Sequence, residues 1–122
     1  MRLGIIGVGN IGFQHANNIL SGIIQGCIIT ALCTRGPCSL AEQSNIPLYS
    51  DYKELIDKQE CDAVIVATPT CSHLEIGCYA LSRGLHVLME KPIGISVAEG
   101  ERMLELVRPE QIFGLMLNQR AD

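Results

Sequence analysis

Residues 2–12 read Arg2-Leu3-Gly4-Ile5-Ile6-Gly7-Val8-Gly9-Asn10-Ile11-Gly12, which predicts a buried strand followed by a glycine turn. Leu3, Ile5 and Ile6 form a short apolar run of the kind found in strands buried on both faces of a parallel sheet. Apolar residues then recur at helical spacing over residues 13–24, so we expect a helix after the turn. The fold is predicted to begin with a strand, a turn and a helix.

Each glycine of the turn has a separate task in binding a dinucleotide. Gly7 allows the tight turn, Gly9 lets the backbone approach a pyrophosphate, and Gly12 lets the helix pack closely on the strand. The phosphates would face unpaired N–H groups at the positive end of the helix dipole. A purely structural turn is the alternative, but the strand before the turn and the helix after it favour a nucleotide site.

Composition restricts the class of protein. The 122 residues are enough for one domain over residues 1–122, but they are few for a dehydrogenase with its own substrate domain. A net charge of -4 argues against a nucleic-acid partner and an anionic membrane surface. No apolar run approaches the ~20 residues of a membrane helix, and no signal peptide precedes the glycine turn, so we expect a cytoplasmic protein.

The cysteines do not predict a metal site or disulfides. The six cysteines include no CxxC pair and no paired-histidine partner set. They are better interpreted as reduced and mostly buried thiols. We therefore expect no bound metal.

A second buried strand is expected at residues 27–33, followed by Thr34 and Arg35. An NAD-binding domain usually has an acidic residue here, roughly 20 residues after the glycine turn, to hold the ribose hydroxyls of adenosine. In this chain no acidic residue precedes Glu42. A hydroxyl and a guanidinium would bind the extra phosphate of NADP, so the sequence favours NADP over NAD. The alternative is that Arg35 lies in a solvated loop.

The rest of the chain alternates between strand and helix patterns. Strands are expected at residues 48–49, 63–67, 85–89 and 111–117, with helices at 39–44, 51–56, 74–81 and 96–107. This alternation predicts an α/β fold with a doubly wound parallel sheet, a Rossmann fold, in strand order 3-2-1-4-5-6.

Two residues beyond the strand at 63–67 bear on the site. Pro69 cannot extend a sheet ladder, so this strand should stop where a ligand crevice opens. His73, in the first turn of the next helix, is either a structural residue or a neighbour of the cofactor.

Three further motifs accompany the glycine turn: Ala67-Thr68-Pro69-Thr70-Cys71-Ser72-His73, Gly84-Leu85-His86-Val87-Leu88, and Glu90-Lys91-Pro92 after a strand. Together they resemble the Gfo/Idh/MocA family, which includes glucose-fructose oxidoreductase and inositol dehydrogenase. The resemblance runs from the glycine turn to the terminal Gln119-Arg120.

The resemblance implies roles for particular residues. Gly7, Gly9, Asn10, Ile11 and Gly12 match the pyrophosphate turn, Thr34 and Arg35 the adenosine-ribose position, and Thr68 and Pro69 the loop beside the cofactor. Glu90 and Lys91 match the pair near the nicotinamide, and Lys91 is the candidate catalytic residue that contacts the reacting hydroxyl of the substrate. Arg120 matches a cofactor-side arginine.

The chain also departs from the family. The segment at residues 35–47 is shorter than usual, and the α+β domain that supplies most substrate contacts is absent.

Two functions remain open. The first is an oxidoreductase, or its cofactor domain, that moves hydride between NADP and a hydroxyl or carbonyl of a sugar-like small molecule. The second is a non-catalytic dinucleotide-binding sensor or regulatory module. Lys91 discriminates between them, because a sensor has no chemical need for lysine at the nicotinamide end. The oligomeric state stays open, with a homo-oligomer among the options.

Overall fold

A computed structural model of the chain describes residues 1–7, 26–34, 38, 41–42, 45–90 and 97–116. Its six strands form one sheet in the order β3-β2-β1-β4-β5-β6, and every neighbouring pair is parallel. This confirms the predicted doubly wound α/β sheet and its strand order. The strands are β1 (Arg2–Ile6), β2 (Ile28–Cys33), β3 (Leu48–Tyr49), β4 (Ala63–Val66), β5 (His86–Glu90) and β6 (Phe113–Met116).

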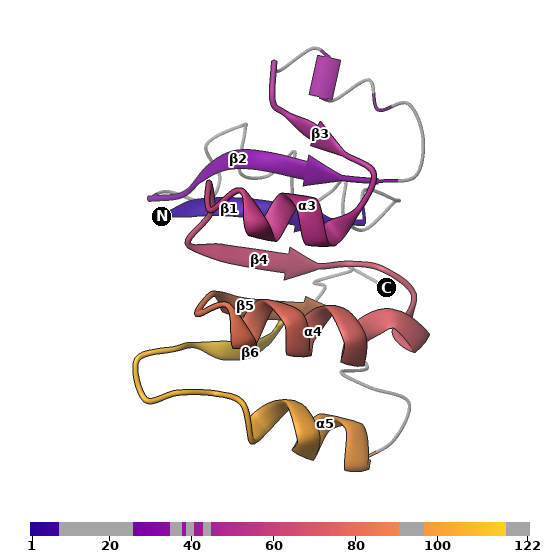
Figure 1. The fold of residues 1–122 in the computed structure, drawn as a ribbon, viewed down its shortest axis with the longest axis vertical. Helices are drawn as coiled ribbons and strands as arrows, with labels where there is room; N and C mark the ends of the chain where they lie inside the picture. The colour runs from indigo at the N-terminus through magenta and orange to yellow at the C-terminus, as the bar shows by residue number, and fades with distance from the viewer. Residues whose placement is uncertain (8–25, 35–37, 39–40, 43–44, 91–96, 117–122) are drawn as a thin grey trace, which may run out of the picture.

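Three helices lie side by side on one face of the sheet (Figure 1). They are α3 (Tyr52–Asp57), α4 (His73–Ser82) and α5 (Val97–Leu104), and a short 3-10 helix, η1 (Thr70–Ser72), leads into α4. Asp51, the first residue of the helix expected at 51–56, caps α3, because its side chain accepts a hydrogen bond from the Lys53 N–H at 3.0 Å. The predicted first helix, at residues 13–24, lies outside the described residues.

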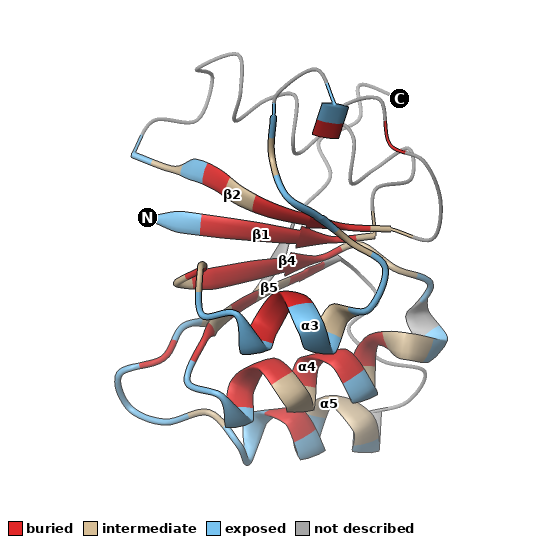
Figure 2. Ribbon diagram, turned by 45° about the horizontal axis from the view of Figure 1, so that its top comes forward, coloured by how far each residue is buried: buried red, intermediate tan, exposed pale blue. Residues whose placement is uncertain are grey.

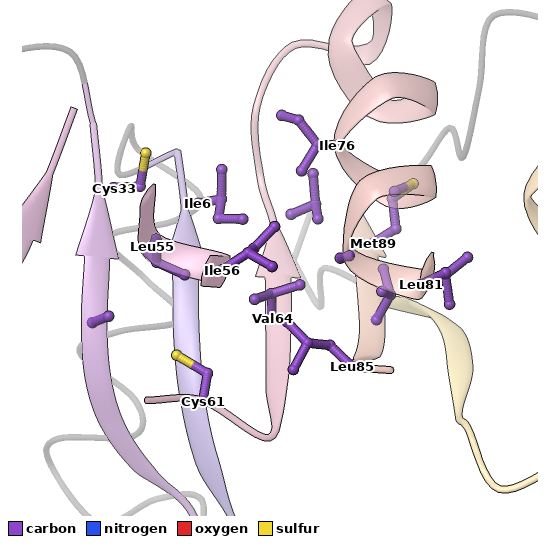
Figure 3. Close-up of a cluster of buried hydrophobic side chains, with 14 of the residues drawn as sticks. Ile6, Cys33, Leu55, Ile56, Cys61, Val64, Ile76, Leu81, Leu85 and Met89 are labelled. Carbon is purple, nitrogen blue, oxygen red and sulfur yellow. The ribbon is translucent and has the colours of Figure 1, made fainter. Parts of the chain in front are cut away.

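The core occupies both faces of the sheet, as expected for parallel strands. Strands β1 and β4 are buried along nearly their whole length (Figure 2). On the helical face, Leu55 and Ile56 of α3 and Ile76 and Leu81 of α4 pack toward Val64 of β4 (Figure 3). On the other face, β1, β2 and β4 contribute Leu3, Ile5, Ile29, Leu32, Ala63 and Ile65 to a second cluster.

Helix α4 packs closely against α5 and β5 at Gly77. A Cβ built there would lie 2.7 Å from Sδ of Met103 and 2.9 Å from Cε of Met89. Both methionines are fully buried. Glycine at position 77 therefore allows α4, α5 and β5 to pack together.

Two expectations about burial are wrong. Leu104 fits the apolar spacing of the helix expected at residues 96–107, which predicts that it is buried, but it is the last residue of α5 and is 58% exposed. The sequence predicts mostly buried thiols, but Cys71, in the 3-10 helix η1, is exposed. Only Cys33, Cys38 and Cys61 are buried, and all six cysteines are free.

Among the residues that the structure describes, no helix is long and apolar enough to cross a membrane.

Candidate functional site

The predicted phosphate turn begins at Gly7, directly after β1. Gly7 has φ +93, a left-handed conformation that glycine adopts without strain. Its N–H donates a hydrogen bond to the carbonyl of Cys33, the last residue of β2, at 2.8 Å. The chain therefore leaves the sheet sharply at Gly7, close to the carboxyl end of β2.

Gly7 lies against the turn that follows β4. A Cβ on Gly7 would lie 2.8 Å from Cγ2 of Thr68 and 2.9 Å from both the carbonyl carbon of Ala67 and the backbone nitrogen of Thr68. The N–H of Ala67 also donates to the carbonyl of Ile6 at 2.8 Å. Strand order reverses between β1 and β4, so this contact lies where doubly wound folds bind ligands.

The loop that carries Thr68 and Pro69 is held from behind by Ser72 and His73. The Ser72 hydroxyl lies 2.8 Å from Oγ1 of Thr68 and 2.8 Å from the Pro69 carbonyl. Nε2 of His73 lies 2.8 Å from the Thr68 carbonyl, and because a carbonyl only accepts, this nitrogen donates. His73 is 1% exposed. His73 therefore holds the loop in place, and it is not among the residues that line the cleft described next.

A cleft of about 540 Å³ opens at the carboxyl ends of β1, β2 and β4. Figure 1 shows the parallel strands of this sheet running in the same direction, so their carboxyl ends lie at one edge. The cleft is lined by Ile6, Gly7, Cys33, Thr34, Ser50, Asp51, Tyr52, Ala67, Thr68, Pro69, Cys71, Ser72, Glu75 and Ile76. It thus brings together four predicted site residues, namely Gly7, Thr34, Thr68 and Pro69.

Sequence reasoning missed the wall of the cleft that β3 and α3 supply. The Thr34 N–H donates to the Tyr49 carbonyl at 3.1 Å, so the ends of β2 and β3 stay paired beyond the strands. Ser50, Asp51 and Tyr52 consequently reach the cleft. The signal was available, because the carboxyl ends of parallel strands meet at one edge of a sheet and Asp51 follows the predicted strand at 48–49.

The titratable groups of the cleft favour a binding role over a nucleophilic one. Burial, with added repulsion from the charges of Asp51 and Glu54, raises the pKa of the Cys33 thiol to about 11. Cys33 is therefore protonated near neutral pH and is a poor nucleophile. Burial also raises the pKa of Tyr52, as does the hydrogen bond that its hydroxyl donates to Glu75 at 2.5 Å.

The other predicted site residues are not placed by the structure. Gly9, Asn10, Ile11, Gly12, Arg35, Lys91 and Arg120 lie outside the described residues, and Glu90 is described only as the backbone end of β5. Within the described ranges, no group of three or more His, Cys, Asp or Glu side chains is arranged to hold a metal ion.

Residues 1–117 match the profile of a family described as oxidoreductases with an NAD-binding Rossmann fold, Gfo/Idh/MocA. The chain is 34% identical to the myo-inositol 2-dehydrogenase of Thermotoga maritima, over all of this chain and 37% of that protein. It is 27% identical to the inositol 2-dehydrogenase of Salmonella typhimurium, over 86% of this chain and 32% of that protein. The chain therefore spans about a third of the length of these relatives.

Solved structures show the same fold. The myo-inositol 2-dehydrogenase of Lactobacillus plantarum superposes with a TM-score of 0.88 at 33% identity, over 95% of this chain and 36% of that one. The scyllo-inositol dehydrogenase of Lactobacillus casei, solved with bound NAD(H) and scyllo-inositol, gives a TM-score of 0.86 at 28% identity, over 94% of this chain and 35% of that one.

Proposed function

Because the chain belongs to the Gfo/Idh/MocA family of oxidoreductases with an NAD-binding Rossmann fold, we propose that its cleft binds a nicotinamide dinucleotide. The observation that carries this proposal is the contact between Gly7 and the Thr68 backbone at the point where strand order reverses. Any side chain on Gly7 would collide with Thr68 and Ala67, so glycine is what allows β1 to turn tightly at the edge of the sheet where doubly wound folds bind dinucleotides.

Different residues are assigned to the pyrophosphate, the adenosine and the nicotinamide parts of the cofactor. Gly7 opens the pyrophosphate turn, which Gly9, Asn10, Ile11 and Gly12 continue. Thr34 and Arg35 hold the adenosine ribose beside β2. Thr68 and Pro69 form the floor on the β4 side, toward the nicotinamide, where Glu90 and Lys91 follow β5. Arg120 is a further cofactor contact. The bound cofactor would accept or donate hydride, while these residues orient it.

We further propose that the chain is the cofactor domain of an oxidoreductase that acts on a hydroxyl or carbonyl of a sugar-like small molecule. Support comes from relatives named as inositol dehydrogenases, which act on cyclic polyols. Lys91 would contact the reacting oxygen, either as a base or as a cation that donates a hydrogen bond. We keep the cytoplasm as the expected compartment, and the oligomeric state, including a homo-oligomer, as open.

The competing function is a dinucleotide sensor without catalysis. Such a module needs the glycine turn and the cleft, but it has no use for a lysine at the nicotinamide end. Lys91 therefore favours the oxidoreductase, and turnover by the unmodified full-length protein separates the two functions.

We predict that the protein binds NADP more tightly than NAD. The reason is Arg35, whose charge-assisted contact with the extra phosphate would be worth about 1.5 to 3 kcal/mol, or roughly a 10- to 150-fold difference in affinity. Titration of the protein with both cofactors by calorimetry measures the preference. Equal affinities or tighter binding of NAD would place Arg35 in solvent, and binding of neither would refute the cofactor site itself.

Substitution Lys91→Ala, made in an active full-length protein that carries this domain, should reduce kcat by roughly 10²- to 10⁴-fold. Cofactor affinity should change little, because the lysine is expected beside the substrate. Steady-state kinetics and a cofactor titration on the same preparation give both values. Lys58→Ala, a substitution at the C-cap of α3, is the matched control and should leave both unchanged. Normal turnover of Lys91→Ala would remove Lys91 from the catalytic machinery.

A further inference from the structure

Asp51 places a negative charge in the cleft. None of the cofactor-binding roles proposed above involves this charge. It follows β3 and lines the cleft together with Thr34 and Gly7. Burial raises the pKa of Cys33, the last residue of β2, and the charge of Asp51 raises it further, which is consistent with a carboxylate near the end of that strand. Asp51 therefore stands beside the part of the cleft that receives adenosine.

The sheet geometry fixes which end of the cofactor Asp51 faces. In a doubly wound fold the pyrophosphate lies over the turn after the first strand, and the adenosine ribose lies at the end of the second. Strand β3 is the neighbour of β2 on the side away from β1, with Cys33 opposite Tyr49 in register. A residue just beyond β3 is thus on the adenosine side of the pyrophosphate, away from the nicotinamide.

The hydrogen bond that caps α3 does not require the negative charge of Asp51, although the positive end of the helix dipole favours it. One oxygen of Asp51, Oδ1, accepts the bond from the Lys53 N–H that caps α3. Asparagine caps helices about as well as aspartate, so the cap needs an oxygen and not a carboxylate. The negative charge is free to act on the ligand.

We propose that Asp51 is a specificity-determining residue that weakens binding of the 2′-phosphate of NADP relative to the ribose hydroxyl of NAD. This rests on the proposed cofactor site. The carboxylate repels a phosphate of about two negative charges but does not repel a hydroxyl. Arg35 and Asp51 then oppose each other, and the preference of the protein is the difference between the two effects.

The test is Asp51→Asn in the full chain, titrated with NADP and with NAD. The affinity for NADP relative to NAD should rise roughly 3- to 10-fold, as expected for a charge several ångströms from the phosphate in a partly hydrated cleft. The gain should shrink as ionic strength increases, because salt screens the repulsion. Asp51→Ser, which also preserves a capping oxygen, repeats the test if Asp51→Asn does not fold.

Asp57→Asn is the matched control. It removes the same charge from the last residue of the same helix, where Asp57 contacts Tyr79 and Arg83 and does not line the cleft. The ratio of affinities should stay at the wild-type value in this variant. An unchanged ratio in Asp51→Asn, or an equal change in Asp57→Asn, would overturn the assignment while leaving the cofactor site intact. Failure of the wild type to bind either cofactor would overturn both.

Discussion

Substitution Gly7→Ala should lower the free energy of unfolding by about 2 to 5 kcal/mol and abolish detectable cofactor binding. A left-handed backbone costs an alanine about 1 to 2 kcal/mol. The new methyl group would also lie 2.8 to 2.9 Å from Thr68 and Ala67, and overpacking of this kind adds about 1 to 3 kcal/mol. Urea unfolding measures the first effect, and titration with NAD and NADP measures the second.

Gly84→Ala is the matched control for this prediction. Gly84 also has a positive φ, +86, but a Cβ there meets nothing within 4 Å. It lies between α4 and β5, away from the residues that line the cleft. Gly84→Ala should therefore show only the backbone cost and retain cofactor binding. If the two variants lose equal stability and both bind cofactor, the contact between Gly7 and Thr68 is relieved by a small shift and has no special function.

The strand order could be predicted because each strand carries its own signal. Residues 3–6 and 63–66 are continuous apolar runs, and both became central strands that are buried on both faces. Alternation with helices, combined with right-handed crossovers, then leaves few arrangements of six parallel strands. The contact between the turns at Gly7 and Thr68 follows from that order, since β1 and β4 are neighbours.

What the sequence did not predict depends on tertiary contacts. Asp51 has the pattern of a helix cap, which by itself does not indicate that the residue lines the cleft; that placement follows from the pairing of β3 with β2. The hydrogen bond of His73 could not be predicted from the sequence, because it depends on where the folded chain places the Thr68 carbonyl. Leu104 fits the apolar spacing of a helix, but the spacing does not indicate that α5 ends at that residue.

The 122-residue chain, assayed by itself, should bind cofactor but show no steady turnover. Binding is expected because the cleft is built from β1, β2, β3, β4 and the elements that follow them, all within this chain. Turnover requires more, since the substrate carbon must be held about 3 to 3.5 Å from the nicotinamide in a fixed orientation. Positioning of this kind contributes roughly 7 to 11 kcal/mol to catalysis.

Lys91 alone cannot supply that positioning, because it offers one contact at the end of a flexible stem. An open nicotinamide face would also be hydrated, which weakens each electrostatic contribution there. The assay mixes the purified chain with NAD, NADP and their reduced forms and with a panel of cyclitols, sugars and small carbonyls, and follows nicotinamide absorbance. Calorimetric titration of the same preparation shows whether cofactor is bound. Binding without turnover is the expected result, whereas steady turnover would mean that the residues of this chain complete an active site without a second domain.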